Sequence, residues 1–166
     1  MLFRSRSNFI RMKNDFYPTP YKAILPLLSQ LDSNVKYIEP CMGEGHLISH
    51  LKLHNHECLY SYDLPIDATS HQYDIDNANY FITNPPWSRT ILHPLINNLR
   101  NQLPTWLLFD ADWAYTQQAS PYLKYCSKIV VIGRVKWIEN SKYTGKENSA
   151  WYLFVNELVK TEFIGK

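Results

Sequence analysis

The four consecutive residues Asn84-Pro85-Pro86-Trp87 are the part of the sequence whose types and order could do chemistry most directly. They follow an apolar run at 80–83 that is typical of a strand. A double proline forces a rigid, extended backbone, which can turn the Asn84 side-chain oxygen and the Pro85 carbonyl toward one point. Two converging acceptors suit an NH2 group, and Trp87 offers a stacking face for a planar molecule. The motif predicts recognition of an amine on a flat group, although the same dipeptides also occur in ordinary turns.

A second motif, Glu39-Pro40-Cys41-Met42-Gly43-Glu44-Gly45, joins an expected strand to an expected helix. Two glycines separated by one residue allow a tight turn against a ligand, but this pattern alone is a weak signal that also fits a plain strand-to-helix turn. Asp63 follows the next apolar strand and lies 18 residues after Gly45. In nucleoside-binding sheets, an acid at this place accepts hydrogen bonds from ribose hydroxyls. The spacing favours that role over the common one of a turn acid.

The elements that must position these motifs alternate between strands and helices. Thr19 can cap the first helix with Pro20 at its first position, and Pro26 should kink or shorten that helix. This alternation predicts an α/β fold, namely a Rossmann-like, doubly wound, mostly parallel sheet with an antiparallel C-terminal strand. In such sheets ligands bind at the carboxyl ends of the strands, where the motifs fall. Strands are expected at 35–39, 58–63, 80–83, 106–109, 128–135 and 150–155, and further helices at 46–53, 91–99 and about 115–125.

Together these motifs resemble the class I amino-methyltransferases, which use S-adenosylmethionine. The resemblance rests on the glycine motif, the acid after the second strand and the Asn-Pro-Pro-aromatic motif. The segments 15–20 (Asp-Phe-Tyr-Pro-Thr-Pro), 133–137 (Gly-Arg-Val-Lys-Trp) and 151–154 (Trp-Tyr-Leu-Phe) further resemble phage-type DNA adenine methyltransferases. The similarity runs through roughly residues 15–155 and is thin between the motifs. It implies the class I methyltransferase fold, S-adenosylmethionine as cofactor, and direct in-line methyl transfer to an exocyclic amine, with adenine N6 in DNA as the expected target.

The resemblance also implies roles for individual residues. The amine would be held by Asn84 and the Pro85 carbonyl, with Pro86 keeping the loop rigid and Trp87 as the platform for the base. An acid near the cofactor adenine would be Asp74, which the sequence does not separate from Asp76 or from a plain surface acid. The other cofactor contacts would be Tyr17, Thr19 and Pro20 at the methionine end, Glu39, Cys41, Gly43 and Gly45 at the amino acid and sugar, and Asp63 at the ribose.

Two other functions fit the same motifs. Related enzymes act on RNA adenine or on a protein glutamine amide, because the Asn-Pro-Pro-aromatic motif is specific for the amine and less so for the polymer. Alternatively, the chain could be a non-catalytic cofactor- or nucleic-acid-binding partner subunit that keeps the fold. The retained Asn-Pro-Pro-Trp motif argues against the second alternative.

Charge and length indicate the partner and the domain organisation. The net charge is +2 over 166 residues, which is only mildly basic. Residues 1–15 are expected to form a basic arm, and residues 16–166 a single methyltransferase domain without a separate target-recognition domain. Two basic groups are either solvated clusters or phosphate contacts to DNA. They are Arg4, Arg6, Arg11 and Lys13 in the arm, and Arg134, Lys136, Lys142 and Lys146 near the C-terminus.

The remaining composition predicts no metal site and no membrane segment. The three cysteines lack the spacing of a zinc site or a disulfide framework. His46, His50 and His54 recur every four residues, which is more typical of a polar helix face than of a metal site without further ligands. No apolar stretch approaches the ~18 residues that span a bilayer. A cytoplasmic protein is expected, in the host cell if the chain is phage-encoded.

Overall fold

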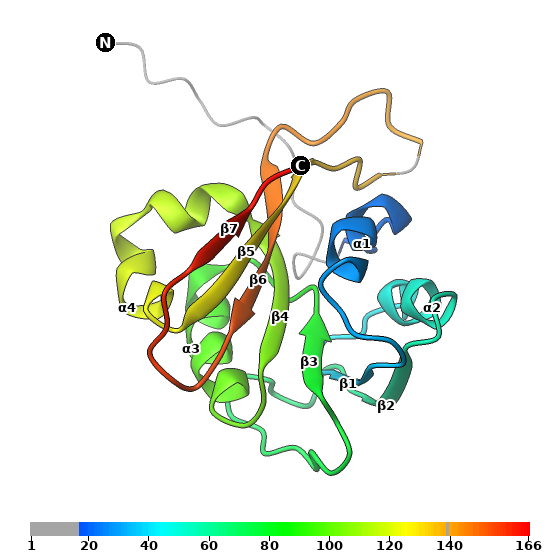
Figure 1. Ribbon diagram of the computed structural model, residues 1–166. Helices are drawn as coiled ribbons and strands as arrows, with labels where there is room; N and C mark the ends of the chain where they lie inside the picture. Colours follow the sequence, from blue (N-terminus) through cyan, green and yellow to red (C-terminus); the bar gives the residue numbers. More distant parts are fainter. Residues whose placement is uncertain (1–16, 139) are drawn as a thin grey trace.

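The computed structural model describes residues 17–138 and 140–166 (Figure 1). The expected basic arm, with Arg4, Arg6, Arg11 and Lys13, lies outside the described residues. The described residues form one seven-stranded sheet in the order β2-β1-β3-β4-β6-β5-β7. The strands are β1 (Lys36–Glu39), β2 (Glu57–Ser61), β3 (Tyr80–Thr83), β4 (Thr105–Asp110), β5 (Cys126–Arg134), β6 (Asn148–Phe154) and β7 (Glu162–Ile164).

The strand directions confirm the Rossmann-like expectation. The pairs β1–β2, β1–β3 and β3–β4 are parallel, and β6 runs antiparallel to both of its neighbours, β4 and β5. Because no helix separates β5 from β6, the chain returns through a loop and reverses direction, as the sequence indicated. The carboxyl ends of β1, β2 and β3 therefore share one edge of the sheet, and the motif residues follow those ends.

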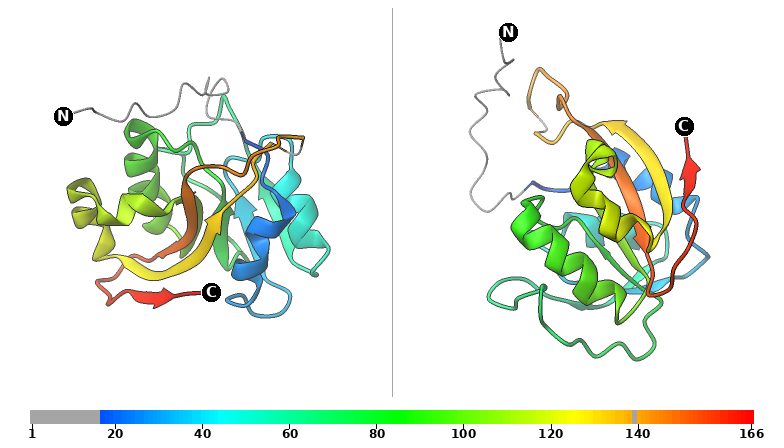
Figure 2. Two further views of the ribbon diagram at one scale, coloured as in Figure 1. Left: turned by 90° about the horizontal axis from the view of Figure 1, so that it is seen from above. Right: turned by 90° about the vertical axis from the view of Figure 1, so that its left-hand side faces the viewer.

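Helices cover both faces of the sheet, as expected (Figure 2). The helices α1 (Tyr21–Leu28) and α2 (His46–Lys52) pack on one face. On the other face lie α3 (Arg89–Arg100) and a short helical segment made of η2 (Ala111–Tyr115), η3 (Gln117–Ala119) and α4 (Ser120–Leu123).

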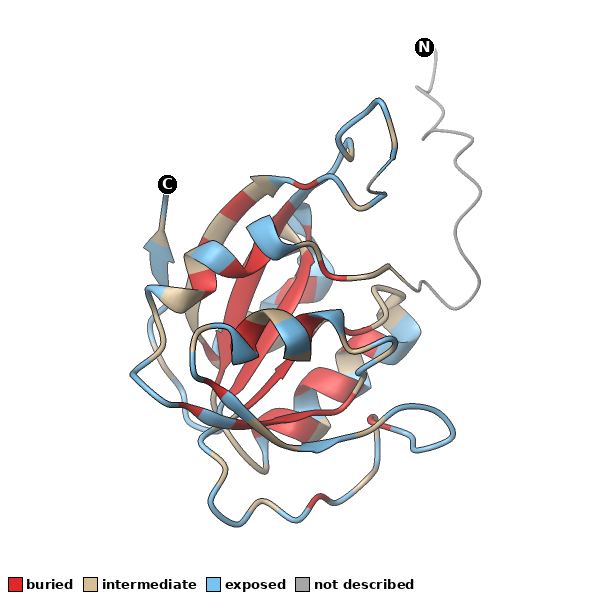
Figure 3. Cartoon of the chain, turned by 90° about the vertical axis from the view of Figure 1, so that its right-hand side faces the viewer, coloured by how far each residue is buried: buried red, intermediate tan, exposed pale blue. Residues whose placement is uncertain are grey.

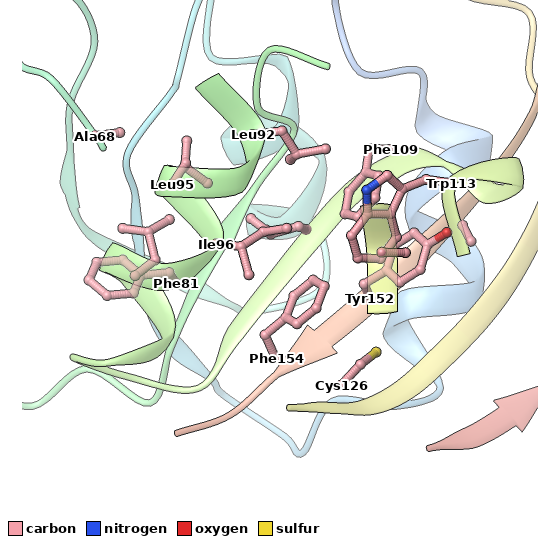
Figure 4. Packing of buried hydrophobic residues seen from close by; sticks show 14 of the residues in the cluster. Ala68, Phe81, Leu92, Leu95, Ile96, Phe109, Trp113, Cys126, Tyr152 and Phe154 are labelled. Atoms are coloured by element: carbon pink, nitrogen blue, oxygen red, sulfur yellow. The ribbon is translucent and has the colours of Figure 1, made fainter. Parts of the chain in front are cut away.

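Alternation of side chains along the central strands builds both cores. Trp151 and Leu153 of β6 point into the core under α1 and α2, whereas Tyr152 and Phe154 point into the other core. The second core is rich in aromatic rings, and Phe109 stacks on Tyr152 with ring centroids 4.1 Å apart (Figure 4). The strands in the middle of the sheet are buried on both faces (Figure 3), which explains their nearly continuous apolar sequences.

The start of α1 differs from the expectation. The helix begins at Tyr21, so Pro20 takes the cap position and no side chain caps the helix. Thr19 is 5% exposed, and its hydroxyl accepts a hydrogen bond from Asn84 rather than from the helix. The predicted cap was wrong because a distant partner engages the hydroxyl. Pro26 lies inside α1, and the helix ends two residues later at Leu28.

Two further elements differ from the sequence prediction. The helix expected at about 115–125 is instead two short 3-10 turns and one turn of α-helix, because Thr116 adopts an extended conformation. The first turn is fixed by the Asp110 carboxylate, which accepts from the Asp112 N–H at 2.9 Å. The three-residue strand β7, which pairs parallel to β5, was not predicted from the sequence.

Candidate active site

A cavity of about 960 Å³ opens at the carboxyl edge of the sheet. This volume is at the upper end of the range for small-molecule sites. Residues from the loops after β1, β2 and β3 and from the segment before α1 line it together. Among the sequence-predicted residues, the lining includes Tyr17, Thr19, Glu39, Cys41, Gly43, Asp63, Asn84 and Pro86. Segments up to 67 residues apart in the sequence are thus brought to one site.

The loop after β1 is shaped by hydrogen bonds within itself and to the residue that follows β2. The Cys41 N–H donates to Glu39 Oε1 at 3.0 Å. The Gly45 N–H donates to the Met42 carbonyl at 2.8 Å, and the Met42 N–H donates to the Tyr62 carbonyl at 2.9 Å. Gly45 has a φ of 77° and occupies the cap position of α2, a left-handed conformation that favours glycine. Gly45 itself is not part of the cavity lining. Gly45 is therefore needed for the tight turn between the β1 loop and α2.

Glu39 is a buried acid in the cavity wall, with 1% of its surface exposed. Burial raises the pKa of its carboxyl to about 8, and the negative charge of Asp63 adds to that shift. The Cys41 N–H and the nearby Thr83 hydroxyl oppose it, although the Thr83 hydroxyl completes no hydrogen bond of good geometry. A cation beside Glu39 would favour the carboxylate.

Cys41 lies in the same wall of the cavity. Burial raises the pKa of its thiol well above the ordinary value, and Glu39 contributes to the shift. A thiol reacts as the thiolate, which this environment disfavours. The cysteine is a free, half-buried side chain that helps to shape the pocket.

The acids after β2 divide between the cavity and the surface. Asp63 lines the cavity, and one of its carboxylate oxygens accepts from the Leu64 N–H at 2.8 Å. Asp67 also lines it, whereas Asp74 does not and instead accepts from the Asp76 N–H at 3.2 Å. The sequence offered no signal for Asp67, because residues 64–79 lack a periodic pattern and form no helix or strand.

Asn84 follows β3 directly and is held by three partners. Its side-chain nitrogen donates to the Tyr17 carbonyl and to Thr19 Oγ1, both at 3.2 Å. Its side-chain oxygen accepts from Trp87 Nε1 at 3.3 Å. Pro85 is buried, and it keeps the backbone extended between Asn84 and Pro86. The Asn84 side chain is therefore oriented by Trp87 within the motif and by Tyr17 and Thr19 from outside it.

Trp137, in the loop after β5, is an aromatic neighbour of the site that was not chosen as a site residue from the sequence. Its ring lies edge-on to Trp87, with centroids 5.4 Å apart, and 6.3 Å from the ring of Tyr17. The three rings are half-buried. Trp137 belongs to the segment whose resemblance to DNA adenine methyltransferases was noted, which is the signal that could have identified it. Pro20, Pro85 and Trp87 do not line the cavity itself.

Arg89 supports the Asn84–Trp87 loop from the other side. It donates to the Trp87 carbonyl at 3.3 Å and forms an ion pair with Asp110 at 2.9 Å. Asp110 ends β4, so this pair ties the loop after β3 to the neighbouring strand. The loop is thereby bound to fixed elements at both ends.

The predicted phosphate-binding residues in the described part of the chain are all exposed. They lie at the end of β5 and in the loop that follows it, which also carries Trp137. They are Arg134, Lys136, Lys142 and Lys146. Of the two histidines on α2, His50 donates to the Thr19 carbonyl at 3.0 Å. His54, which follows α2, shares a hydrogen bond with the hydroxyl of Tyr21, the first residue of α1. These bonds hold α1 and the segment before it against α2 and the residues after it.

Within residues 17–138 and 140–166, no group of three histidine, cysteine or acidic side chains is arranged to hold a metal ion. None of the helices in the described part of the chain has the length and apolar character needed to cross a membrane.

Several solved structures share this architecture. A candidate class I S-adenosylmethionine-dependent methyltransferase from Listeria monocytogenes matches with a TM-score of 0.59 and 12% identity, over 95% of this chain and 67% of that one. The fold is that of a class I methyltransferase. A candidate RNA methyltransferase from Pyrococcus horikoshii matches this methyltransferase fold with a TM-score of 0.55 and 13% identity, over 87% of this chain and 88% of that one.

A third similar structure is longer than this chain. The modification subunit of a candidate type I restriction enzyme from Vibrio vulnificus matches with a TM-score of 0.52 and 11% identity. The match covers 90% of this chain and 47% of that subunit. No protein-family model and no curated protein sequence matches this chain.

Proposed function

We propose that this protein transfers the methyl group of S-adenosylmethionine to an exocyclic amine, and that the amine is N6 of adenine in DNA. The observation that carries the proposal is one shared cavity. Asn84, at the end of β3, lines it together with Glu39 after β1 and Asp63 after β2. The methyltransferase fold and the similarity to a modification subunit and to an RNA methyltransferase support a nucleic-acid substrate.

The first half of the cavity suits the cofactor. Glu39 and Asp63 provide an acid for an ammonium group and an acid for ribose hydroxyls, and the backbone of the loop after β1 allows close approach. A cationic amino group beside Glu39 would lower the pKa of that carboxyl, so that Glu39 would lose its proton and its carboxylate would stabilise the cation. The bound cofactor supplies an electrophilic methyl group on a sulfonium sulfur. Cys41 and Gly43 complete this wall, and Thr19 and Tyr17 face it from the segment before α1.

The second half suits the amine. The lone pair of an adenine N6 amine is delocalised into the ring, which makes the amine a poor nucleophile. Hydrogen bonds from N6 to the Asn84 side-chain oxygen and the Pro85 carbonyl would localise the lone pair on the nitrogen. The methylated nitrogen would then lose one proton to solvent, so the chain contributes positioning and fixed dipoles, with no need for a strong general base.

The surroundings suit a base on a charged polymer. Trp87, Trp137 and Tyr17 provide aromatic surfaces beside Asn84, and base stacking on such rings is tolerant of sequence. In a duplex the target base would have to leave the stack to reach the cavity. The exposed basic residues of the loop after β5 would contact phosphates, which would make binding steeply dependent on salt.

The proposal is tested by offering methyl-labelled S-adenosylmethionine with separate pools of unmodified DNA, RNA and protein. The labelled polymer is then digested to nucleosides or amino acids. Label in N6-methyladenine from DNA is the expected result. Label in RNA adenine or in glutamine would keep the amine chemistry and replace the substrate. Cofactor binding without label in any pool would refute catalysis and favour a partner subunit.

A further inference from the structure

The contacts of the Asn84 side chain fix which end of its amide faces which neighbour. The Tyr17 carbonyl, 3.2 Å away, can only accept a hydrogen bond, so the atom that faces it must be the NH2 group. The Trp87 indole N–H, 3.3 Å away, can only donate, so the atom that faces it must be the oxygen. Two neighbours of opposite character therefore give the amide one orientation, independently of how its two ends are assigned.

Thr19 supplies the remaining partner. Its hydroxyl oxygen accepts from the Asn84 NH2 group at 3.2 Å, so the two hydrogens of that group match two acceptors within the chain. The side-chain oxygen has two lone pairs, of which Trp87 uses one. What Asn84 can still offer a ligand is a single acceptor.

We infer that Thr19 is a positioning residue, which locks the Asn84 amide so that its oxygen is presented to the substrate amine. The inference rests on the proposed function. A hydroxyl can donate as well as accept, so the Tyr17 carbonyl and the Trp87 N–H choose the orientation, and Thr19 anchors the NH2 group in it. Without the Thr19 hydroxyl, only the Tyr17 carbonyl would hold the NH2 group. The amide could then shift and carry its oxygen away from the substrate amine.

The position of Thr19 is itself well defined. The residue is 5% exposed, and its carbonyl accepts from His50 Nε2 at 3.0 Å. Helix α2, which follows the β1 loop, thus holds Thr19 in place, and Thr19 in turn contacts Asn84 after β3. Thr19 connects the cofactor side of the cavity to its amine side through two hydrogen bonds.

The kinetic test compares Thr19→Val with Thr19→Ser. Valine keeps the branched shape of the buried side chain and removes the acceptor, whereas serine keeps the acceptor. At saturating cofactor and DNA, we expect Thr19→Val to lower kcat by about ten- to a hundred-fold, the usual effect of one lost hydrogen bond to a group that must stay oriented. Thr19→Ser should recover most of that loss. Because Thr19 lines the cavity, the cofactor dissociation constant is measured for each variant by calorimetry.

A second readout does not depend on activity. The side-chain NH2 resonances of Asn84 are assigned by their absence in Asn84→Asp, and their exchange with solvent is compared with that of the exposed Asn101. We expect slow exchange in the wild type, faster exchange in Thr19→Val and slow exchange again in Thr19→Ser. Exchange as fast as that of Asn101 in the wild type, or a kcat unchanged in Thr19→Val, would overturn the inference.

The two proposals fail in different ways. Protected Asn84 hydrogens in a wild-type protein that methylates no amine would support the lock and refute the proposed function. Methyl transfer by a protein whose Asn84 hydrogens exchange freely would support the function and refute the lock.

Discussion

The loops after β1 and β3 line the same cavity, but they are held in different ways. The β1 loop is held by bonds within itself, from Cys41 to Glu39 and from Gly45 to Met42, and by bonds to Tyr62, which directly follows the adjacent strand β2. The residue that follows β3 depends on Tyr17 and Thr19, which lie 67 and 65 residues away in the sequence. The first loop is therefore held by itself and by its neighbouring strand, whereas the orientation of Asn84 also depends on a segment that is remote in the sequence. Changes at the β3 loop should mainly affect the reaction, and changes at the β1 loop mainly binding and stability.

The largest expected effect is that of Asn84→Ala. If Asn84 holds the reacting amine as proposed, removing its acceptor should lower kcat by 10²–10³-fold or more, on the scale seen when one preorganised hydrogen-bonding group is lost. Cofactor binding, measured by calorimetry, should stay within a few-fold of the wild type. Asn101→Ala, at an exposed asparagine after α3, is the matched control and should leave both quantities unchanged. A kcat within tenfold of the wild type in Asn84→Ala would place the amine contact elsewhere.

A change at Glu39 tests the β1 side of the cavity. Its pKa is about 8 in the folded protein and near 4.5 in the unfolded chain, so the folded state holds the proton more tightly. This contribution to stability is fully present below pH 4.5 and is lost as the pH rises through about 8.

The free energy of unfolding should therefore fall between pH 5 and pH 8 more in the wild type than in Glu39→Gln. The difference is expected to be on the order of a few kcal/mol. Urea unfolding at the two pH values measures this difference. If the free energy of unfolding changed equally with pH in both proteins, Glu39 would be ionised in the folded state.

Trp137→Ala is expected to weaken substrate binding rather than chemistry. Stacking on one aromatic side chain is worth roughly 1–3 kcal/mol, so the KM for DNA should rise by about five- to 150-fold while kcat changes less. Trp137→Phe keeps an aromatic ring beside Trp87 and should retain most of the affinity. Initial rates over a range of DNA concentrations separate the two constants. A KM that is the same for alanine and phenylalanine would mean that Trp137 does not contact the substrate.

The smallest effect should come from Gly45→Ala. The added Cβ would meet no atom within 4 Å, so its cost comes only from the left-handed backbone, where φ is 77°. That conformation costs a residue other than glycine roughly 1–2 kcal/mol. Thermal or urea unfolding should show a loss of this size, with kcat preserved at saturating cofactor. A loss of kcat as large as that in Asn84→Ala would mean that the two loops are not independent.

The same contrast explains which features could be predicted from the sequence. The strand ends and the β1 turn depend on local patterns, namely apolar runs followed by glycine and proline, and these were recognised. The role of Thr19 was misread as a helix cap, because its true partner, Asn84, is remote in the sequence. A sequence pattern does not reveal which distant hydroxyl will contact which amide, because that contact exists only in the folded sheet.

The missed elements have a related cause. The region at 115–125 has helical periodicity but is divided by the extended Thr116, and β7 is only three residues long. Neither feature has a strong local signal. Trp137 came into the site through the return of the loop after β5, a path that spacing along the chain does not reveal.

The most direct test of the central claim is the chemical position of the transferred methyl group. Wild-type protein is incubated with S-adenosylmethionine and unmodified duplex DNA, and the digested nucleosides are identified by chromatography and mass spectrometry against N6-methyladenine and 5-methylcytosine standards. The account predicts N6-methyladenine in the wild-type reaction and none above background with Asn84→Ala. A methyl group on a ring carbon, or equal amounts of N6-methyladenine from both proteins, would contradict it.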